Sequence, residues 1–329
     1  MITAQILLLV VLCLVLIYST SMIVRSLKSL ARASHLGAYG LTAFVLAIST
    51  SLPELVVSIV ASLEGKTSLI LGNIIGSNIA DLSLVIGGAA VLGGSLKVSG
   101  IVLKRDIYLT GAAGLLPIFL IADGTLSQAD GIVLLVIYFM LVTTFLRSHQ
   151  RSLAVHALFG SPVKRLLMAV THHNGHNGVW RFALGIGLLL ISSHFIVRLS
   201  TALALSTGLS TLFIGLFIVS IGTSLPELAF EIKAISSGHA AMALGDLLGS
   251  VVANSTLILG IASLIRPLTL SHQGLVPYGT AIFTFTIMYL CFIFFIKSKK
   301  KLEWWEGLVL VSLYFVFVLV EYLGKQWNL

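Results

Sequence analysis

An internal duplication is the feature that most constrains this chain. Residues 47–90 align without gaps with residues 220–263 at a constant offset of 173, and 18 of the 44 aligned positions are identical, including "TSLPEL" in both copies. Self-similarity over a long period indicates a fold built from repeated units. We therefore expect two structurally related halves.

Long apolar stretches indicate that both halves lie in a membrane. Hydrophobic residues make up 57% of the 329 residues and charged residues only 10%, whereas a soluble domain carries about 25% charged residues. A helix that crosses a bilayer needs about 20 apolar residues. The pattern predicts an all-α integral membrane protein with ten transmembrane helices, over residues 2–24, 38–63, 68–96, 107–122, 130–146, 182–199, 207–236, 240–265, 274–296 and 306–323.

Basic residues are unevenly distributed over the loops between these segments. Counted along the chain, the odd-numbered loops hold sixteen of the 20 Lys and Arg residues, and the rest of the chain holds only Lys66, Arg198, Arg266 and Lys325. Cytoplasmic loops carry the excess of Lys and Arg, so we expect a cell (inner) membrane protein with both termini outside the cytoplasm. The net charge of +8 follows from this topology, and basic residues dispersed in this way do not predict nucleic-acid binding.

Each half contains five predicted helices, which fixes how the halves are oriented. Because five is odd, the second half enters the membrane from the opposite face, and inverted repeats of this kind are typical of secondary transporters. We expect a first half over 1–146, a cytoplasmic linker over 147–181 and a second half over 182–329. The linker contains "THHNGHNG". This tract either binds a metal ion or is an ordinary polar connection.

Each repeat places a proline and a glutamate side by side inside an apolar segment. Pro53 and Pro226 cannot donate to the carbonyl four residues before them, and a carbonyl freed within a bilayer needs another partner. Glu54 and Glu227 are ionisable groups within a membrane, where such residues are generally functional. A structural ion pair is the alternative, but no Lys or Arg lies deep within a predicted helix. A bound cation is therefore the expected counter-charge.

Further oxygen atoms follow at helical spacing. Residues three and four positions apart share a face of a helix. Three or four residues before a motif glutamate lie Thr50 and Ser51 in the first repeat and Thr223 and Ser224 in the second. In the helices that follow, "GNIIGSNIAD" and "GDLLGSVVAN", the pairs four residues apart are Ser77 with Asp81 and Ser250 with Asn254. Carboxylate, hydroxyl and carbonyl oxygens are the ligands of hard cations. Small residues also allow close helix packing, which is the alternative role for these glycines and serines.

Three other polar residues in the predicted helices have less specific expectations. Asp246 either joins the site or caps a helix break, and His194 is a bundle histidine with a partner. Glu231 lies one turn beyond Glu227, and we expect it to form an interfacial pair with Lys233 or to be a vestibule charge.

The two "TSLPEL" stretches, each followed by a "G-N/D-x-x-G-S" helix, resemble the α-repeats of the cation/calcium exchanger (CaCA) superfamily, in particular of prokaryotic sodium/calcium exchangers. The resemblance implies the sodium/calcium exchanger fold over the whole chain. It implies an antiporter, not an enzyme, that moves Ca²⁺ against Na⁺ by alternating access. It further implies no cofactor besides the transported ions and no obligatory protein partner, so we expect a monomer.

The resemblance also assigns roles to individual residues. Glu54 and Glu227 would be the central Ca²⁺ ligands, together with the backbone carbonyls of Thr50 and Thr223. Flanking Na⁺ sites would be completed by Ala47, Ser51, Ser77, Ser220, Ser224 and Ser250, and the middle of the site would be framed by Asp81 and Asn254. The chain departs from the family pattern in carrying its acid in the first repeat and its amide in the second, and in having Ser rather than Ala at position 220. These departures leave ion preference and stoichiometry open.

Four alternatives remain open at this point. A Ca²⁺/H⁺ antiporter of the same fold is the nearest, although its motifs usually lack the paired "TSLPEL" form, and a K⁺-dependent Na⁺/Ca²⁺ exchanger follows. A cation channel is a different class, but channels usually enclose a pore by oligomeric symmetry, whereas this chain completes a site alone. An intramembrane aspartyl protease is the enzyme alternative, and "ALGD" at 243–246 lacks the G-x-G-D form of that class.

Overall fold

The computed structural model describes residues 2–33, 51–97, 101–149, 176–238, 240–270, 272–299 and 301–326, which are almost entirely helical. Its first half contains α1 (Ile2–Ala33), α3 (Leu52–Leu63), α4 (Thr67–Ala80), the π-helical segment η1 (Asp81–Val85), α5 (Ile86–Gly93), α6 (Ile101–Leu120) and α7 (Gln128–His149). Its second half contains α9 (His176–Thr207), α10 (Thr211–Ile214), η3 (Gly215–Val219), α11 (Ser220–Ser236), α12 (Ala240–Val252), η4 (Ala253–Ile258), α13 (Leu259–Ile265), α14 (His272–Lys299) and α15 (Trp304–Gln326).

The helices follow the ten predicted segments. Eight helical stretches are long and apolar enough to cross a membrane. The other two predicted segments correspond to α3, whose described part has 12 residues, and to α6, which begins with the charged run Lys104, Arg105 and Asp106. The structure is therefore that of a multi-span membrane protein and is compatible with ten helices.

Two short strand pairs show which loops lie together. Strand β1 (Leu96–Lys97) pairs with β4 (Lys301–Leu302), and β2 (Thr125–Leu126) pairs with β3 (Leu268–Thr269), both antiparallel. Helix α6 joins β1 to β2 and α14 joins β3 to β4, so the two pairs lie at opposite ends of the bundle. Helix α5 ends just before β1 and α13 just before β3. Equivalent helices of the two repeats thus run in opposite directions.

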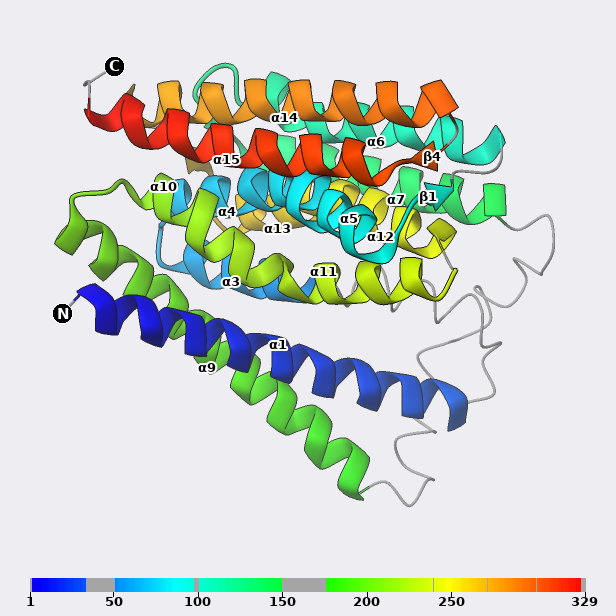
Figure 1. Cartoon of the computed structure of the whole chain (residues 1–329). Coiled ribbons are helices and arrows are strands. Elements are labelled where there is room, and N and C mark those ends of the chain that lie inside the picture. The colour runs from blue at the N-terminus through cyan, green and yellow to red at the C-terminus, as the bar shows by residue number, and fades with distance from the viewer. Residues whose placement is uncertain are drawn as a thin grey trace.

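The repeat helices occupy the middle of the molecule. The stretches Thr67–Gly93, Met242–Ile265 and Thr211–Ser236 are 94%, 72% and 61% buried, whereas the other five candidate spans are 22–33% buried. Figure 1 shows α1 and α9 on one side of these central helices and α14 and α15 on the other, with both chain ends at the same end of the bundle. Lipid would therefore face mainly the outer helices, and the duplicated motifs lie inside.

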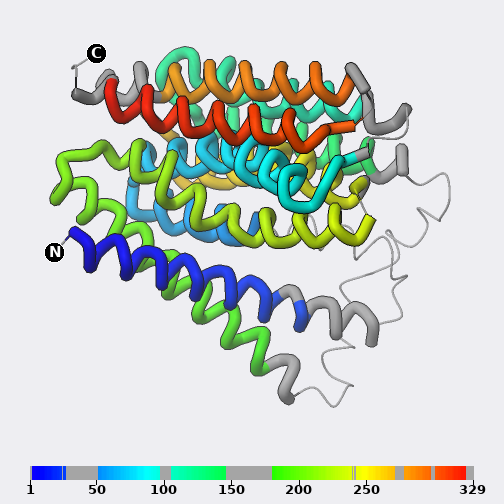
Figure 2. The backbone as a smooth tube through the Cα atoms, viewed as in Figure 1, coloured from blue at the N-terminus to red at the C-terminus, as the bar shows by residue number. Residues whose placement is uncertain are grey.

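Helices α1 and α9 form an antiparallel pair along one side (Figure 2). Ser206 donates a hydrogen bond to Gln5 at 3.0 Å, and near the other end of the pair Gly185 packs closely against Ile23. Helix α1 also reaches the centre, because the Cys13 thiol lies against the backbone of Gly222 in α11. A shift of α1 and α9 would therefore change the packing against Gly222, which directly precedes the second "TSLPEL" stretch.

The two halves make direct backbone contact where α4 crosses the α10–η3 segment. A Cβ atom added to Gly72 would lie 2.4 Å from the Leu212 carbonyl oxygen, and one added to Gly76 would lie 2.5 Å from that of Leu216. On the facing side, a Cβ at Gly215 would lie 2.9 Å from the Asn73 nitrogen. Only glycine permits this approach, and small residues serve the same purpose in other membrane helices.

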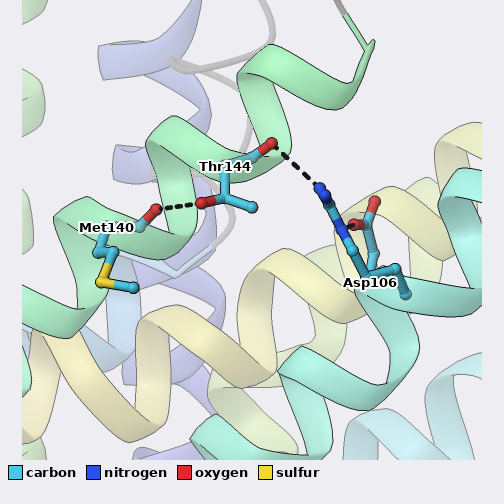
Figure 3. A network of polar contacts seen from close by, with 4 residues as sticks. Asp106, Met140 and Thr144 are labelled. Carbon is cyan, nitrogen blue, oxygen red and sulfur yellow. Dashed lines mark hydrogen bonds and ion pairs between the residues drawn. The ribbon is translucent and has the colours of Figure 1, made fainter.

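A polar contact joins α6 to α7 near their charged ends. Arg105 approaches Asp106 at 3.7 Å and the carbonyl oxygen of Thr144 at 3.5 Å. The Thr144 hydroxyl in turn donates to the carbonyl of Met140 at 2.7 Å (Figure 3). The buried Asp106 therefore has a basic neighbour at the start of α6, whereas the ion pairs of the described residues include none of Glu54, Asp81 and Glu227.

Several helices extend beyond their predicted ends. We expected the first helix to end at residue 24, but α1 continues to Ala33 and includes Arg25, Lys28 and Arg32. Likewise α9 begins at His176 and ends at Thr207, well outside the predicted 182–199. Hydropathy locates the part that lies in lipid, whereas the Arg, Lys, Leu and Ala residues of 25–33 and the Ala and Leu residues of 200–207 favour continued helix beyond it.

The α4–η3 crossing yields a stability prediction. We expect Gly76→Ala to lower the free energy of unfolding by about 1–3 kcal/mol, because the added methyl group must displace backbone. Gly187→Ala is the matched control, since a Cβ there meets nothing within 4 Å and alanine is favoured over glycine in a helix by about 0.5–1 kcal/mol. Thermal unfolding of the detergent-solubilised protein measures both. Equal midpoints for the two variants would contradict the close approach.

Candidate cation-binding site

Four helices place the predicted ligands at the centre of the bundle. Glu54 lies in the first turn of α3 and Glu227 lies within α11. The helices that follow carry a polar residue every fourth position on one face. In the first repeat these residues are Asn73, Ser77 and Asp81, and in the second, at the same offset of 173, they are Asp246, Ser250 and Asn254.

π-Helical segments interrupt the helices beside these residues. Segment η1 starts at Asp81, η4 includes Asn254, and η3 ends immediately before Ser220. Segments of this type shift the register of the helix and are frequent at functional sites. Here they lie where the stripes of polar residues meet the opposite repeat.

The acids of the centre are buried without a basic residue. Glu54 is 1% exposed, Asp81 2% and Glu227 3%. In the part of the chain that the structure describes, every buried residue with a formal charge is an Asp or a Glu. Among the described residues, neither Glu54 nor Glu227 forms an ion pair. An ionised carboxylate in such a place needs a cation or a proton to neutralise it.

Hydrogen bonds connect the two repeats across the centre. The side-chain amide of Asn78 donates to the Ser255 hydroxyl at 2.8 Å, and the amide of Asn254 donates to the Asn78 oxygen at 3.1 Å. The hydroxyl of Thr223 lies 3.4 Å from the side-chain oxygen of Asn73. These contacts hold α4 against η4 and α11, so the polar stripes of both halves face one interior.

Several buried oxygen atoms in this interior have no hydrogen-bond partner among the described residues. They belong to three carboxylates, three hydroxyls and one amide, namely Glu54 Oε2, Asp81 Oδ1, Glu227 Oε2, Ser51 Oγ, Ser224 Oγ, Ser250 Oγ and Asn254 Oδ1. Buried polar atoms are nearly always hydrogen-bonded, so such a cluster indicates a ligand. These oxygen atoms, three of them in acids, suit a hard cation such as Na⁺ or Ca²⁺, and the side-chain nitrogen of Asn73 also has no partner among the described residues.

The acids do not form a site by themselves. Within the described ranges, no three His, Cys, Asp or Glu residues converge as a metal ion would require. The carboxylates nevertheless lie within electrostatic reach of one another, since Glu54 acts on both Asp81 and Glu227. Hydroxyl, amide and backbone oxygens must therefore complete any coordination shell, as they do at Ca²⁺ sites in other proteins.

The remaining predicted ligands lie as follows. Ser77 approaches Thr223 at 3.5 Å, and the Ser220 hydroxyl is directed to the carbonyl of Leu216 in its own helix at 2.5 Å. Ala47 and Thr50 lie outside the described residues, as does most of the "THHNGHNG" tract. Whether these residues contribute as expected stays a prediction.

Asn73, Asn78 and Ser255 belong to this centre although the sequence analysis did not single them out. Asn73 was detectable, because it precedes Ser77 by four residues and so shares a face with Ser77 and Asp81. Asn78 and Ser255 lie outside that stripe. They become recognisable only when the two repeats are packed together.

One of the two alternatives for Glu231 is wrong, and the expectation for His194 is confirmed. Glu231 does not pair with Lys233, since Lys233 is exposed whereas Glu231 is buried. Helical geometry is the reason, because two residues two positions apart point to different sides of a helix. His194, by contrast, has a partner as expected, with its Nδ1 atom 3.0 Å from the Glu64 carboxylate.

Comparison with known proteins agrees with this geometry. The family model described as "Sodium/calcium exchanger protein" matches residues 4–147 and 177–323. The inner membrane protein YrbG of Escherichia coli is 32% identical over 265 residues, which cover 79% of this chain and 79% of that protein. The sodium/calcium exchanger MaX1 of Methanosarcina acetivorans is 27% identical over 354 residues, 97% of this chain and 99% of the relative.

Solved structures show the same fold. A structure of the sodium–calcium exchanger NCX_Mj soaked with 2.5 mM Na⁺ and 10 mM Sr²⁺ is 25% identical, superposes with a TM-score of 0.63, and matches 96% of this chain and 98% of its own. Another, soaked with 100 mM Na⁺ and 10 mM Sr²⁺, gives a TM-score of 0.62. The predicted fold class and resemblance are confirmed: the chain is a member of the sodium/calcium exchanger protein family.

Proposed function

We propose that this protein is a secondary antiporter that exchanges Na⁺ for Ca²⁺ across the membrane by alternating access. The observation that carries the proposal is the cluster of buried, unpartnered oxygen atoms that both repeats contribute where the described chain has no buried base. The family membership and the names of the relatives support the same ions. Because one chain supplies all of the proposed ligands, a transporter that acts as a monomer is favoured over an oligomeric channel.

Shared ligands would make the two ions exclude each other. Glu54, Asp81 and Glu227 together supply up to three negative charges, which one Ca²⁺ or several Na⁺ ions can neutralise, but not both sets at once. Exchange rather than cotransport follows from this competition. A site without ions should resist conversion between its two orientations, because its carboxylates would be desolvated without counter-charge.

The inverted repeats supply the two orientations. We propose that the halves over 1–146 and 182–329 open the site alternately to the two faces of the membrane, and that α1 and α9 move with this change along the central helices. The bias of basic residues supports a cytoplasmic position for the β1–β4 end and an extracytoplasmic position for both termini. The cell (inner) membrane is the proposed location.

The driving ion can be decided with purified protein in liposomes. We expect an outward Na⁺ gradient to drive uptake of radioactive Ca²⁺, and an outward H⁺ gradient at fixed voltage to drive little or none, because hydroxyl and amide ligands favour a metal cation over a proton. Uptake driven by H⁺ alone would contradict the Na⁺ assignment. It would identify a Ca²⁺/H⁺ antiporter with the same fold and site.

Removing one motif carboxylate should abolish exchange. We expect Glu54→Gln and Glu227→Gln each to lower Ca²⁺ uptake by about 100-fold or more, since loss of one partner of a buried charge pair costs about 3–5 kcal/mol. Glu64→Gln is the matched control, because this residue follows α3 and contacts His194 rather than the site. Uptake near the wild-type level in either motif variant would refute the assignment.

This chain has its acid, Asp81, in the first repeat and its amide, Asn254, in the second, the reverse of the family pattern, and this reversal gives a separate prediction. We expect Asp81→Asn to reduce Na⁺-driven uptake because it removes one charge from the site, and the double variant Asp81→Asn/Asn254→Asp to recover part of it by returning that charge to the pseudo-equivalent position. Uptake assays with and without an imposed voltage measure both effects. A double variant no better than Asp81→Asn would show that the position of the acid, rather than the total charge, matters.

A further inference from the structure

A row of three hydrogen-bonded side chains ends at Asn254, one of the proposed ligands. The side-chain nitrogen of Asn254 donates to the side-chain oxygen of Asn78 at 3.1 Å, and the nitrogen of Asn78 donates to the Ser255 hydroxyl at 2.8 Å. Each of these residues is only 1% exposed. We refer to Ser255, Asn78 and Asn254, in this order, as the polar triad.

The polar triad decides which atom of the Asn254 side chain is free. A carboxamide has an oxygen that accepts hydrogen bonds and a nitrogen that only donates them. Because Asn78 holds the nitrogen of Asn254, the atom left without a hydrogen-bond partner among the described residues is the oxygen, Oδ1. Amide oxygens coordinate hard cations, whereas the hydrogens of an NH₂ group carry positive partial charge and repel them. The hydrogen bond to Asn78 therefore leaves the coordinating atom available.

Another buried amide of the centre has the opposite orientation. The side-chain oxygen of Asn73 lies 3.4 Å from the Thr223 hydroxyl, which donates to it, and the nitrogen of Asn73 is the atom without a partner among the described residues. Burial in this interior therefore does not by itself leave an amide oxygen free. The orientation of Asn254 depends on the partner of its nitrogen, which is Asn78.

The repeat shows that the scaffold can pack without a polar triad. At the offset of 173, the three members of the triad correspond to Leu82, Val251 and Asp81. Leu82 and Val251 are both 0% exposed, so apolar side chains fill the equivalent positions. A carboxylate such as Asp81 presents an oxygen whichever way it turns, whereas a carboxamide presents one in only one of two orientations. The orienting partners thus occur beside the amide and not at the positions equivalent to them.

We propose that Asn78 is a positioning residue that keeps the side-chain oxygen of Asn254 available to the transported cation, and that Ser255 holds Asn78 in the orientation which this requires. The inference rests on the proposed function, since the cation is the Ca²⁺ assigned to the site. Asn78 acts through Asn254 and not as a ligand. Without it, the amide of Asn254 is free to turn its NH₂ group toward the ion, which replaces an attractive contact by a repulsive one.

Equilibrium binding of radioactive Ca²⁺ to the purified full-length protein without Na⁺ tests the proposal. Asn78→Val introduces the residue that the second repeat has at this position. We expect it to raise the dissociation constant for Ca²⁺ by about tenfold, because loss of a group that orients a metal ligand commonly weakens binding by about 10–100-fold. Ser255→Ala should raise the constant less, since Asn78 remains. Ser255→Thr keeps the hydroxyl and is the matched control, with binding like that of the wild type.

A second comparison separates positioning from packing. In the variant Asn254→Ala the side chain that Asn78 orients is absent, so adding Asn78→Val should change the dissociation constant by less than about twofold, the scatter expected for independent effects. A role in packing alone would give the same loss in both backgrounds, because the contact between the helices is removed in each. Thermal unfolding checks that each variant is folded, and Ser255→Ala provides the test if Asn78→Val does not fold.

The possible failures are distinguishable. Wild-type dissociation constants in both Asn78→Val and Ser255→Ala would overturn the positioning role and leave the exchange site intact. Equal losses from Asn78→Val in the wild-type and Asn254→Ala backgrounds would do the same. Ca²⁺ binding and Na⁺-driven uptake that survive Glu54→Gln and Glu227→Gln unchanged would instead refute the proposed function, and the positioning role would fall with it.

Discussion

Negative charge that is buried without a basic partner is the constraint on which the rest of this structure depends. Asp106 has Arg105 beside it, and Glu306 accepts a hydrogen bond from the backbone of Glu303. Glu54, Asp81, Glu227 and Glu231 form no ion pair among the described residues, and they lie on the central helices. Their charge needs cations or protons, so the stability of the folded state and the occupancy of the site are linked through binding.

The helices can bring these groups together only because their backbones approach closely. Gly72, Gly76 and Gly215 remove the side chains that would separate α4 from η3. Asp81 and Asn254 lie in the π-helical segments η1 and η4, where the register of the helix shifts. Asn78 links the halves through Asn254 and Ser255. The packing role of the glycines is therefore observed, and the ligand role of the hydroxyls stays a prediction.

Duplication gives a nearly symmetric scaffold, and this chain places its charges on that scaffold asymmetrically. The acid Asp81 of the first repeat corresponds to the amide Asn254 of the second, and Glu231 and Asp246 correspond to Ser58 and Asn73. The two faces of a membrane have different ion concentrations, so the paths by which ions reach the site from each face need not be identical. Differences between the repeats are thus the natural places to look for direction and ion preference in members of this family.

The sequence by itself determined the membrane class, the number of apolar segments, the inverted repeat and the motif acids, because hydropathy and helical periodicity act locally and need no tertiary contacts. The uneven distribution of Lys and Arg also predicted which loops face the cytoplasm. The sequence could not locate the ends of α1 and α9, where propensity extends the helices beyond the lipid-facing part. Only the tertiary structure decided that Asn78 and Ser255 belong to the centre and that Glu231 is buried whereas Lys233 is exposed. Those facts depend on which faces of four helices meet, and that choice is made by packing between residues about 170 positions apart.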